Sequence, residues 1–381
     1  MVGYGIVIPL LPFYITEYSP SALLVGSLGS LYAAMQFVGG PVLGGLSDRI
    51  GRRPVLLFCI FGTGIAYLVL GFADTLALVV LAIVLDGATG GNLATAQAYV
   101  ADSTTPERRA RGLGLIGAAF GLGLIAGPAL GGLLSLYSLG APAFVAAALA
   151  LSNTVFGLFA LPESLPRERR IRTPLLRLNP ISQISGALRL PGIRTLLLVV
   201  FLLNLSFAGL INNFPLFSNA RFGWDASANA FLFAAVGVCA VLTQGVLLGR
   251  LQPVFGEVRL LVGGLALLAA SLCLLALAPQ AWMLYPVTCT LAVGAGLAIP
   301  SVTALISTRV SGGEQGRLMG GIQAILSLAM IVGPAISGLA FDYLGVPAPY
   351  WIGGLLAALA LLTVLLTLSS RREPARLPPE G

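Results

Sequence analysis

A single acidic residue, Asp86, lies deep within a long apolar run of this 381-residue sequence. At mid-bilayer a charge costs about 2.5–3.5 kcal/mol on insertion scales, so an acid held there usually faces a cavity and serves function. On a helical wheel Asp86, Gly90, Leu93 and Gln97 share one face, which would turn the carboxyl group toward a central cavity. Two interpretations stay open: a group that binds a proton or substrate, or a packing residue hydrogen-bonded to a neighbouring helix.

Amide side chains interrupt several other apolar runs. In lipid an unpaired amide is costly, so each one must meet another helix, water or a bound molecule. We treat these amides as candidate contacts of a substrate cavity, with an ordinary helix–helix hydrogen bond as the alternative. They are Gln36, Asn92, Gln97, Asn204, Asn212, Gln244 and Gln323.

The residue types that are missing exclude whole classes of chemistry. All 21 basic residues are arginine, and histidine is absent. Without Lys there is no P-loop, and without His there is neither an HExxH zinc site nor a Ser-His-Asp triad. The four cysteines form no CxxC pair and lie in apolar segments, so we interpret them as buried thiols. The sequence therefore predicts no enzyme, no metal site and no cofactor.

The composition points to lipid as the solvent of this chain. It is 57% hydrophobic and only 9% charged, whereas soluble domains carry about 25% charged residues. A spanning helix needs about 20 mostly apolar residues. We therefore predict an all-α integral membrane protein with twelve spans, near 1–15, 21–45, 54–73, 76–100, 112–136, 142–161, 192–216, 226–248, 258–278, 282–307, 317–341 and 348–369.

The distribution of arginine supports this count. Alternate loops hold nearly all of the positive charge, and only Arg221 falls on the other side. Such asymmetry marks the cytoplasmic loops of a membrane protein, so the net charge of +7 indicates topology rather than nucleic-acid binding. The same rule predicts a cytoplasmic C-terminus.

The chain divides into two similar halves. A Pro- and Arg-rich linker, 163–191, separates an N-terminal half, 1–162, from a C-terminal half, 192–370, which a tail, 371–381, follows. The pattern from Arg111 to Leu133 recurs 206 positions later, from Arg317 to Leu339. A repeat of six helices is a transporter architecture, with the binding site between the halves near the membrane midplane.

Two motifs carry the most specific signal. The loop after the second span combines a tight turn with an acid and several bases, at Gly44, Asp48, Arg49, Gly51 and Arg52. The fifth span has glycines at four-residue spacing, which make a flat face for another helix, and a proline that kinks it. These residues are Gly114, Gly123, Gly127, Pro128, Gly131 and Gly132.

These motifs resemble the signature loop and the antiporter motif of the major facilitator superfamily. The opening residues 3–12 and the segments 96–102, 161–164 and 222–225 also look like the tetracycline-efflux members of its drug/proton antiporter branch. The resemblance covers nearly the whole chain. It implies the major facilitator fold, twelve helices in two six-helix pseudo-repeats, and proton-coupled efflux of small amphipathic drugs such as tetracycline by alternating access.

The resemblance also assigns roles. Asp48 would face the N-terminus of span eleven, where negative charge is favoured, and Arg52 would pair with Asp102, so that both contacts lock the outward-facing state. Spans seven and eleven adjoin the cavity in the family, which favours Asn204 and Gln323 as cavity residues.

Two departures keep other functions open. Ile83 stands where the drug/proton relatives usually carry Arg, and the acidic residue that they often carry in span one is missing. The alternatives are therefore a metabolite uptake symporter or uniporter and, in another class, a non-transporting membrane sensor.

For its setting, we expect a monomer in the bacterial inner membrane. Its partners would be a small-molecule substrate, protons and the lipid bilayer, with a proton gradient as the energy source.

Overall fold

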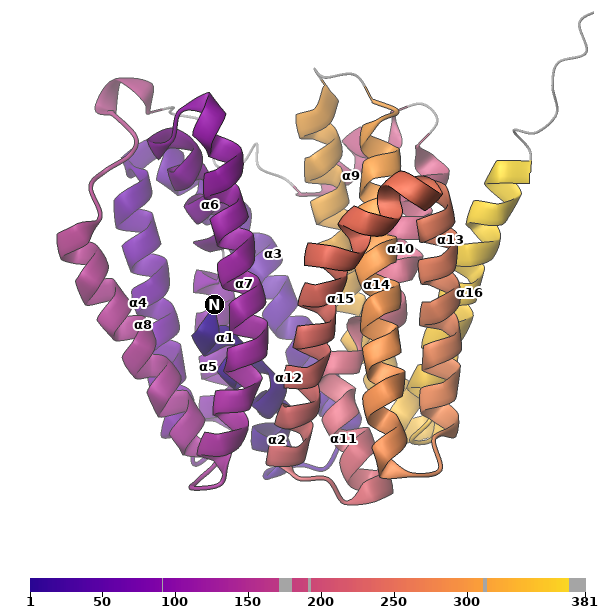
Figure 1. Cartoon of the computed structure of the whole chain (residues 1–381). Helices are drawn as coiled ribbons and strands as arrows, with labels where there is room; N and C mark the ends of the chain where they lie inside the picture. Colours follow the sequence, from indigo (N-terminus) through magenta and orange to yellow (C-terminus); the bar gives the residue numbers. More distant parts are fainter. Residues whose placement is uncertain (91, 171–179, 191–192, 311–313, 370–381) are drawn as a thin grey trace, which may run out of the picture.

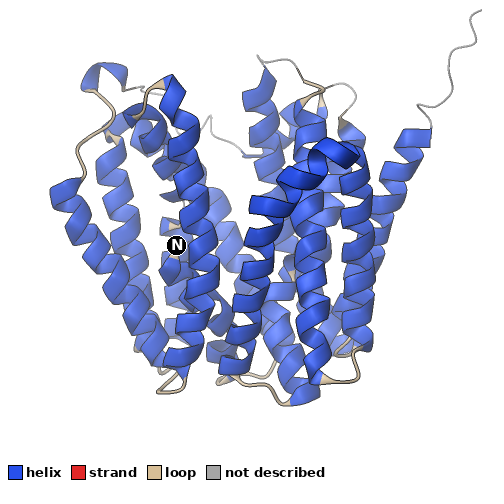
Figure 2. Ribbon diagram, viewed as in Figure 1, coloured by secondary structure: helices blue, strands red, loops and turns tan. Residues whose placement is uncertain are grey.

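The computed structural model describes residues 1–381 except 91, 171–179, 191–192, 311–313 and 370–381. All regular secondary structure in the described part is helical (Figures 1 and 2). The first eight helices are α1 (Val2–Val7), α2 (Leu11–Thr16), α3 (Ala22–Ile50), α4 (Arg52–Gly71), α5 (Leu76–Thr89), α6 (Asn92–Ser103), α7 (Pro106–Ser135) and α8 (Gly140–Ala160). The others are α9 (Pro180–Leu188), α10 (Arg194–Ala208), α11 (Leu210–Phe222), α12 (Ala226–Leu242), α13 (Leu248–Leu277), α14 (Leu284–Ser307), α15 (Gln315–Leu344) and α16 (Ala348–Ser369). Short elements are η1 (Ile8–Leu10), η2 (Arg167–Arg169), η4 (Thr243–Leu247) and η5 (Ala281–Met283).

Eight helical segments of the described residues are long and apolar enough to cross a membrane, or nine if the bent pair α10–α11 is one span. One of the eight, Ala226–Leu277, has 52 residues. At about 1.5 Å per residue it is more than twice as long as the about 30 Å of hydrocarbon. Its backbone leaves the helical conformation at Gly256, where φ is 71° and ψ is 165°. The predicted spans 226–248 and 258–278 therefore both fall within this segment, apart from residue 278.

Three predicted spans are not continuous helices. The first consists of α1, η1 and α2, and Pro9 and Pro12 stand near the starts of η1 and α2, because proline cannot donate a helical hydrogen bond. The predicted span 76–100 ends at Thr89, and α6 starts at Asn92. The predicted span 192–216 divides at Gly209 into α10 and α11. The spans were predicted from their apolar content, which does not register a break in a helix.

The described helices bury two large hydrophobic cores. One core is built from the N-terminal part of the chain, with buried residues from Ile6 to Ala147. The other is built from the C-terminal part, with buried residues from Ala187 to Val364. Figure 1 shows the corresponding ribbons as two groups side by side. Part of the segment predicted as a linker, 180–188, is a helix, α9, that contacts α15.

Close backbone contacts join the two groups, and they follow the sequence repeat. A Cβ built at Gly132 of α7 would lie 2.6 Å from Cβ of Ala230 in α12. The residue 206 positions later, Gly338 of α15, faces α3 in the same way, and its Cβ would lie 2.4 Å from the carbonyl oxygen of Ala22. Glycine is needed at both places because any side chain would separate the helices.

Two adjacent glycines of α13 provide a test of this packing. A Cβ at Gly264 would lie 2.7 Å from the carbonyl oxygen of Gly294 in α14, whereas Gly263 has nothing within 4 Å. We expect Gly264→Leu to destabilise the protein by about 1–3 kcal/mol, because inserting bulk into packed helices forces them apart. Gly263→Leu should leave the unfolding temperature in detergent nearly unchanged. Equal unfolding temperatures for the two variants would show that the α13–α14 contact is not close.

Candidate functional site

Asp86 lies near the end of α5 and is 7% exposed. The hydroxyl groups of Thr63 and Tyr67 of α4 and of Tyr32 of α3 surround its carboxylate and can donate to it. A buried charge is tolerated only when it is paired or hydrogen-bonded, and three hydroxyl groups meet this need without a cation. The acid is therefore held by a shell of donors on two neighbouring helices.

The polar cluster extends beyond these hydroxyl groups. Gln36, one turn after Tyr32, donates from Nε2 to the Tyr32 hydroxyl over 2.9 Å. A cavity of about 20 Å³ adjoins the cluster and is lined by residues that include Asp86, Tyr32, Tyr67 and Val7. This volume suffices for about one water molecule.

The structure corrects the predicted orientation of Asp86. Because α5 ends at Thr89, a continuous wheel from Asp86 to Gln97 does not apply. The cavity beside Asp86 is lined by residues of α1, η1, α2, α3, α4 and α5, so the acid lies inside the N-terminal group of helices. Gln97 is exposed and lies on a separate helix, α6.

A second group of charges surrounds Arg52 at the start of α4. Arg52 Nη1 lies 2.6 Å from Asp48 Oδ1, and Arg52 Nε lies 3.0 Å from Asp102 Oδ2. Nη1 also donates to Ser47 Oγ over 2.6 Å. The guanidinium thus joins the end of α3, the start of α4 and the end of α6, and the Arg52–Asp102 pair expected from the resemblance is formed.

Glu163, which follows α8, completes this cluster. Its Oε1 accepts hydrogen bonds from the backbone N–H of Arg52 at 2.8 Å and of Leu165 at 3.0 Å. Partial burial disfavours its charged form, but the backbone donors at Leu165, Arg52 and Arg53 and the nearby Arg170 together lower the pKa of Glu163. An ionised carboxylate at the first turn of α4 is stabilised by the helix dipole.

Gly51 makes room for this carboxylate. Its φ is +117°, and a Cβ would lie 2.2 Å from Glu163 Oε2. Both the backbone conformation and the space exclude a side chain.

The glycine-rich face of α7 packs against the first helices. A Cβ at Gly127 would lie 2.5 Å from backbone atoms of Gly5, and a Cβ at Gly131 would lie 2.9 Å from the carbonyl oxygen of Ile6. Gly123 contacts Met1 in the same manner, whereas Gly114 has nothing within 4 Å. Pro128 lies inside α7. The motif therefore allows close packing on two sides of α7: Gly123, Gly127 and Gly131 face the N-terminal residues, and Gly132 faces α12.

The remaining amide candidates are not gathered in one place. Asn204 donates to the Val200 carbonyl of its own helix over 2.8 Å. Asn212 of α11 lies against Gly29 of α3, where a Cβ would come 2.8 Å from Nδ2. Gln244 and Gln323 are exposed, and the side chain of Asn92 lies outside the described part. The contacts of the described residues of this set define no common binding pocket.

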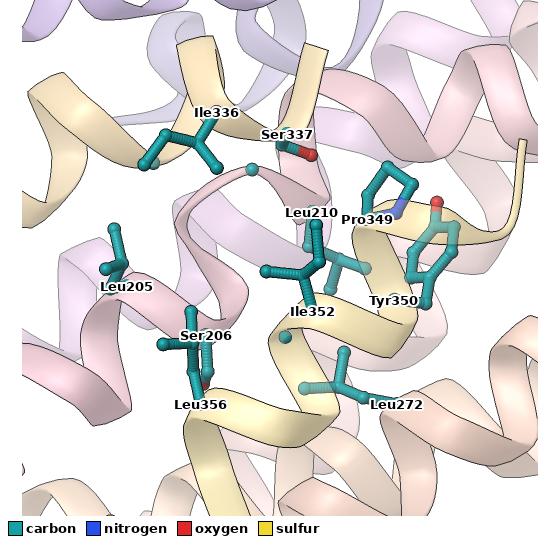
Figure 3. Close-up of a pocket in the computed structure, with 13 residues that line it drawn as sticks. Leu205, Ser206, Leu210, Leu272, Ile336, Ser337, Pro349, Tyr350, Ile352 and Leu356 are labelled. Carbon is teal, nitrogen blue, oxygen red and sulfur yellow. The ribbon is translucent and has the colours of Figure 1, made fainter. Parts of the chain in front are cut away.

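A second cavity, of about 30 Å³, lies among α10, α11, α13, α15 and α16 (Figure 3). Its lining is mostly apolar and includes Leu205, Ile336 and Tyr350. The Tyr350 hydroxyl is buried and has no hydrogen-bond partner among the described residues. The volume accommodates water but not a drug-sized molecule.

Sequence reasoning missed three partners in these clusters, namely Thr63, Tyr67 and Glu163. Thr63 and Tyr67 are one turn apart in α4, and this polar pair at i, i+4 in an apolar helix was a usable signal. Glu163 was noted only as part of a motif, because its contact with Arg52 spans 111 positions.

The comparisons agree with the motifs. A model of the Major Facilitator Superfamily matches residues 1–253 and 222–381. The class C tetracycline resistance protein of Escherichia coli is 38% identical over 338 residues, which are 88% of this chain and 85% of that protein. The class B protein, also of Escherichia coli, is 30% identical over 379 residues, which are 97% of this chain and 92% of that protein.

A solved structure supports the fold. The human organic anion transporter MFSD10 (TETRAN) superposes with a TM-score of 0.68 at 25% sequence identity, over 95% of this chain and 97% of that one. Family match, identity and fold agree, and the chain belongs to the major facilitator superfamily.

Proposed function

We propose that this protein exports small amphipathic drugs, with tetracycline as the leading candidate, in exchange for protons and by alternating access. The observation that carries the proposal is the 38% identity with a tetracycline resistance protein over 88% of the chain. The two motifs that this branch shares, at residues 44–54 and 114–132, support the same function. No catalytic constellation in the sequence competes with it, because Lys and His are absent.

The membrane topology is part of this proposal. We infer twelve crossings of a bacterial inner membrane, with the Arg-rich loops and the C-terminus in the cytoplasm. Residues 1–162 and 192–370 would be the two moving halves of a monomer, with 163–191 between them and 371–381 as a tail. The five-helix cavity of Figure 3 is too small for a drug, so the substrate would bind between the halves. Gln36, Asn92, Gln97, Asn204, Asn212, Gln244 and Gln323 remain its candidate contacts.

Asp86 is our candidate for the proton site. Its burial and its three hydroxyl partners allow both the ionised and the protonated carboxyl group to be hydrogen-bonded. The adjoining cavity can hold a water molecule next to it. Tyr32 and Gln36 both lie on α3 and are hydrogen-bonded to each other. A change in the protonation of Asp86 would therefore change the hydrogen bonds of α3.

The charge cluster around Arg52 is our candidate for the inner gate. Arg52 ties α4 to Asp102 of α6, and Glu163 ties the start of α4 to the segment after α8. These contacts hold the cytoplasmic ends of four helices together, so that they move as one body. Gly44 and Arg49 complete the gate motif, and Asp48 would meet the N-terminus of α15 in the outward-facing state.

Proton coupling through Asp86 can be tested in membrane vesicles. In acidified inside-out vesicles that contain the wild-type protein, tetracycline should cause a collapse of the pH gradient. We expect Asp86→Asn to abolish this collapse, because an amide cannot release a proton. The measurement is the quenching of a pH-sensitive dye as the drug is added.

Asp74→Asn is the matched control, since Asp74 is an exposed acid in the loop before α5; it should behave as wild type. If Asp86→Asn still couples drug movement to protons, Asp86 is a packing residue. Drug accumulation in energised cells, instead of export, would favour the uptake alternative.

The role of the Arg52 cluster as a gate can be tested at Asp102. Asp102→Asn removes one of the two acids that neutralise Arg52, which weakens the tie between α4 and α6. We expect a maximal transport rate lower by about threefold to tenfold with little change in the drug concentration at half-maximal rate, because the change alters opening rather than binding. Glu168→Gln, an exposed acid in η2, is the control. A pure loss of apparent affinity in Asp102→Asn would place this acid in drug binding instead.

A further inference from the structure

Asp342 forms a contact between the two halves. It lies near the C-terminal end of α15, and its carboxylate meets the N-terminus of α3. Ser21 Oγ donates to Oδ2 over 2.8 Å, the Leu23 N–H donates to Oδ2 over 2.9 Å, and the Ala22 N–H donates to Oδ1 over 3.0 Å. One acid therefore accepts three hydrogen bonds from the other half of the chain.

The helix dipoles favour the contact of the Asp342 carboxylate with the start of α3. An acid at the C-terminal end of a helix is disfavoured by the dipole of that helix, and an acid at an N-terminus is favoured. The first turn of α3 has no acid of its own, and its Ser21 cap satisfies only the Leu24 N–H, at 3.2 Å. Asp342 thus supplies the negative charge and the acceptors that α3 lacks.

The contact lies at the N-terminus of α3, whereas the Arg52 cluster lies at its C-terminus. There the two backbones touch: a Cβ at Gly26 would lie 2.1 Å from the carbonyl oxygen of Pro334. Opening this end of the molecule must separate α3 from α15, and Asp342 then loses all three hydrogen bonds.

In the described part of the related helix pair, α7 and α12, no acid makes such a contact. The position 206 residues before Asp342 is Leu136, at the end of α7. The acid at the start of α12, Asp225, caps its own helix through the Ala228 N–H at 2.8 Å. Of the two related pairs, α3–α15 has an acid that bonds the partner helix at this end, whereas the acid of α7–α12 caps its own helix.

We propose that Asp342 is the outer gate of the transport cycle: its contact with α3 holds the outer side closed and biases the protein toward the inward-open state. This role rests on the alternating access proposed above. Asp342 acts by positioning the helices and does not touch the substrate.

The experiment measures two distances across the halves in lipid nanodiscs without substrate. The four native cysteines are replaced by serine, and spin labels are attached at Ser138→Cys and Gln280→Cys for the outer side and at Phe159→Cys and Val254→Cys for the inner side; all four positions are exposed. In Asp342→Ala we expect the population with a long outer and a short inner distance to rise about fivefold, in line with the loss of a helix cap and a dipole partner.

Three further variants sharpen the result. Ser21→Ala removes one of the three hydrogen bonds to Asp342, together with the cap on the Leu24 N–H, and should give a smaller shift. Asp342→Glu should restore most of the wild-type distribution. Asp225→Ala, which removes a cap within one half, should leave both distances unchanged.

Unchanged distances in Asp342→Ala, or equal shifts in Asp342→Ala and Asp225→Ala, would overturn the proposal. If Asp342→Ala does not fold, Ser21→Ala decides, because it keeps the acid and two bonds. The distances need no substrate, so a protein that fails to export tetracycline still tests the gate. A protein that exports tetracycline with an unaltered distribution in Asp342→Ala refutes the gate alone.

Discussion

In the hydrocarbon of a membrane, no water is available to satisfy the polar groups of the backbone. The rest of this structure depends on that constraint. It makes every described regular element helical and leaves polar side chains with few alternatives to bonding one another. It also removes the hydrophobic driving force between helices, so close contact must come from backbones that approach directly. The glycines at positions 26, 127, 132, 264 and 338 meet this need.

The same constraint explains the two polar clusters and their difference. Asp86 has no cation beside it among its hydrogen-bond partners and is held by hydroxyl groups of two helices inside an apolar core. Hydroxyl groups can donate to the ionised carboxylate and accept from the protonated carboxyl group. Arg52 stands at the start of α4 between two acids. Its guanidinium group keeps its charge, and the two ion pairs fix its position. The first setting suits the binding of a proton, and the second suits a mechanical tie.

The halves are similar in their framework and different in their charges. Gly51 and Gly256, at nearly the repeat offset, both have a positive φ. Yet the guanidinium of Arg52 is replaced by the acid Glu257, whose Oε1 accepts from Gln252 at 3.2 Å. Asp342 has no acidic counterpart at Leu136. Two halves with the same packing but different ionic contacts can rock about a common axis while the two ends of the molecule are held by different bonds.

The sequence by itself determined the solvent of the chain, the helical class, the repeat and the family, because these depend on composition and on motifs within a few turns of one helix. It also placed Arg52 beside Asp102 through the family motif. Tertiary structure decided where Asp86 lies. The sequence predicted one continuous helical face from Asp86 to Gln97 toward a central cavity, but α5 ends at Thr89. The partners of Glu163 and Asp342 were also beyond the sequence, since they lie 111 and about 320 positions away. Contacts of that separation depend on how whole helices pack, and no local pattern encodes them.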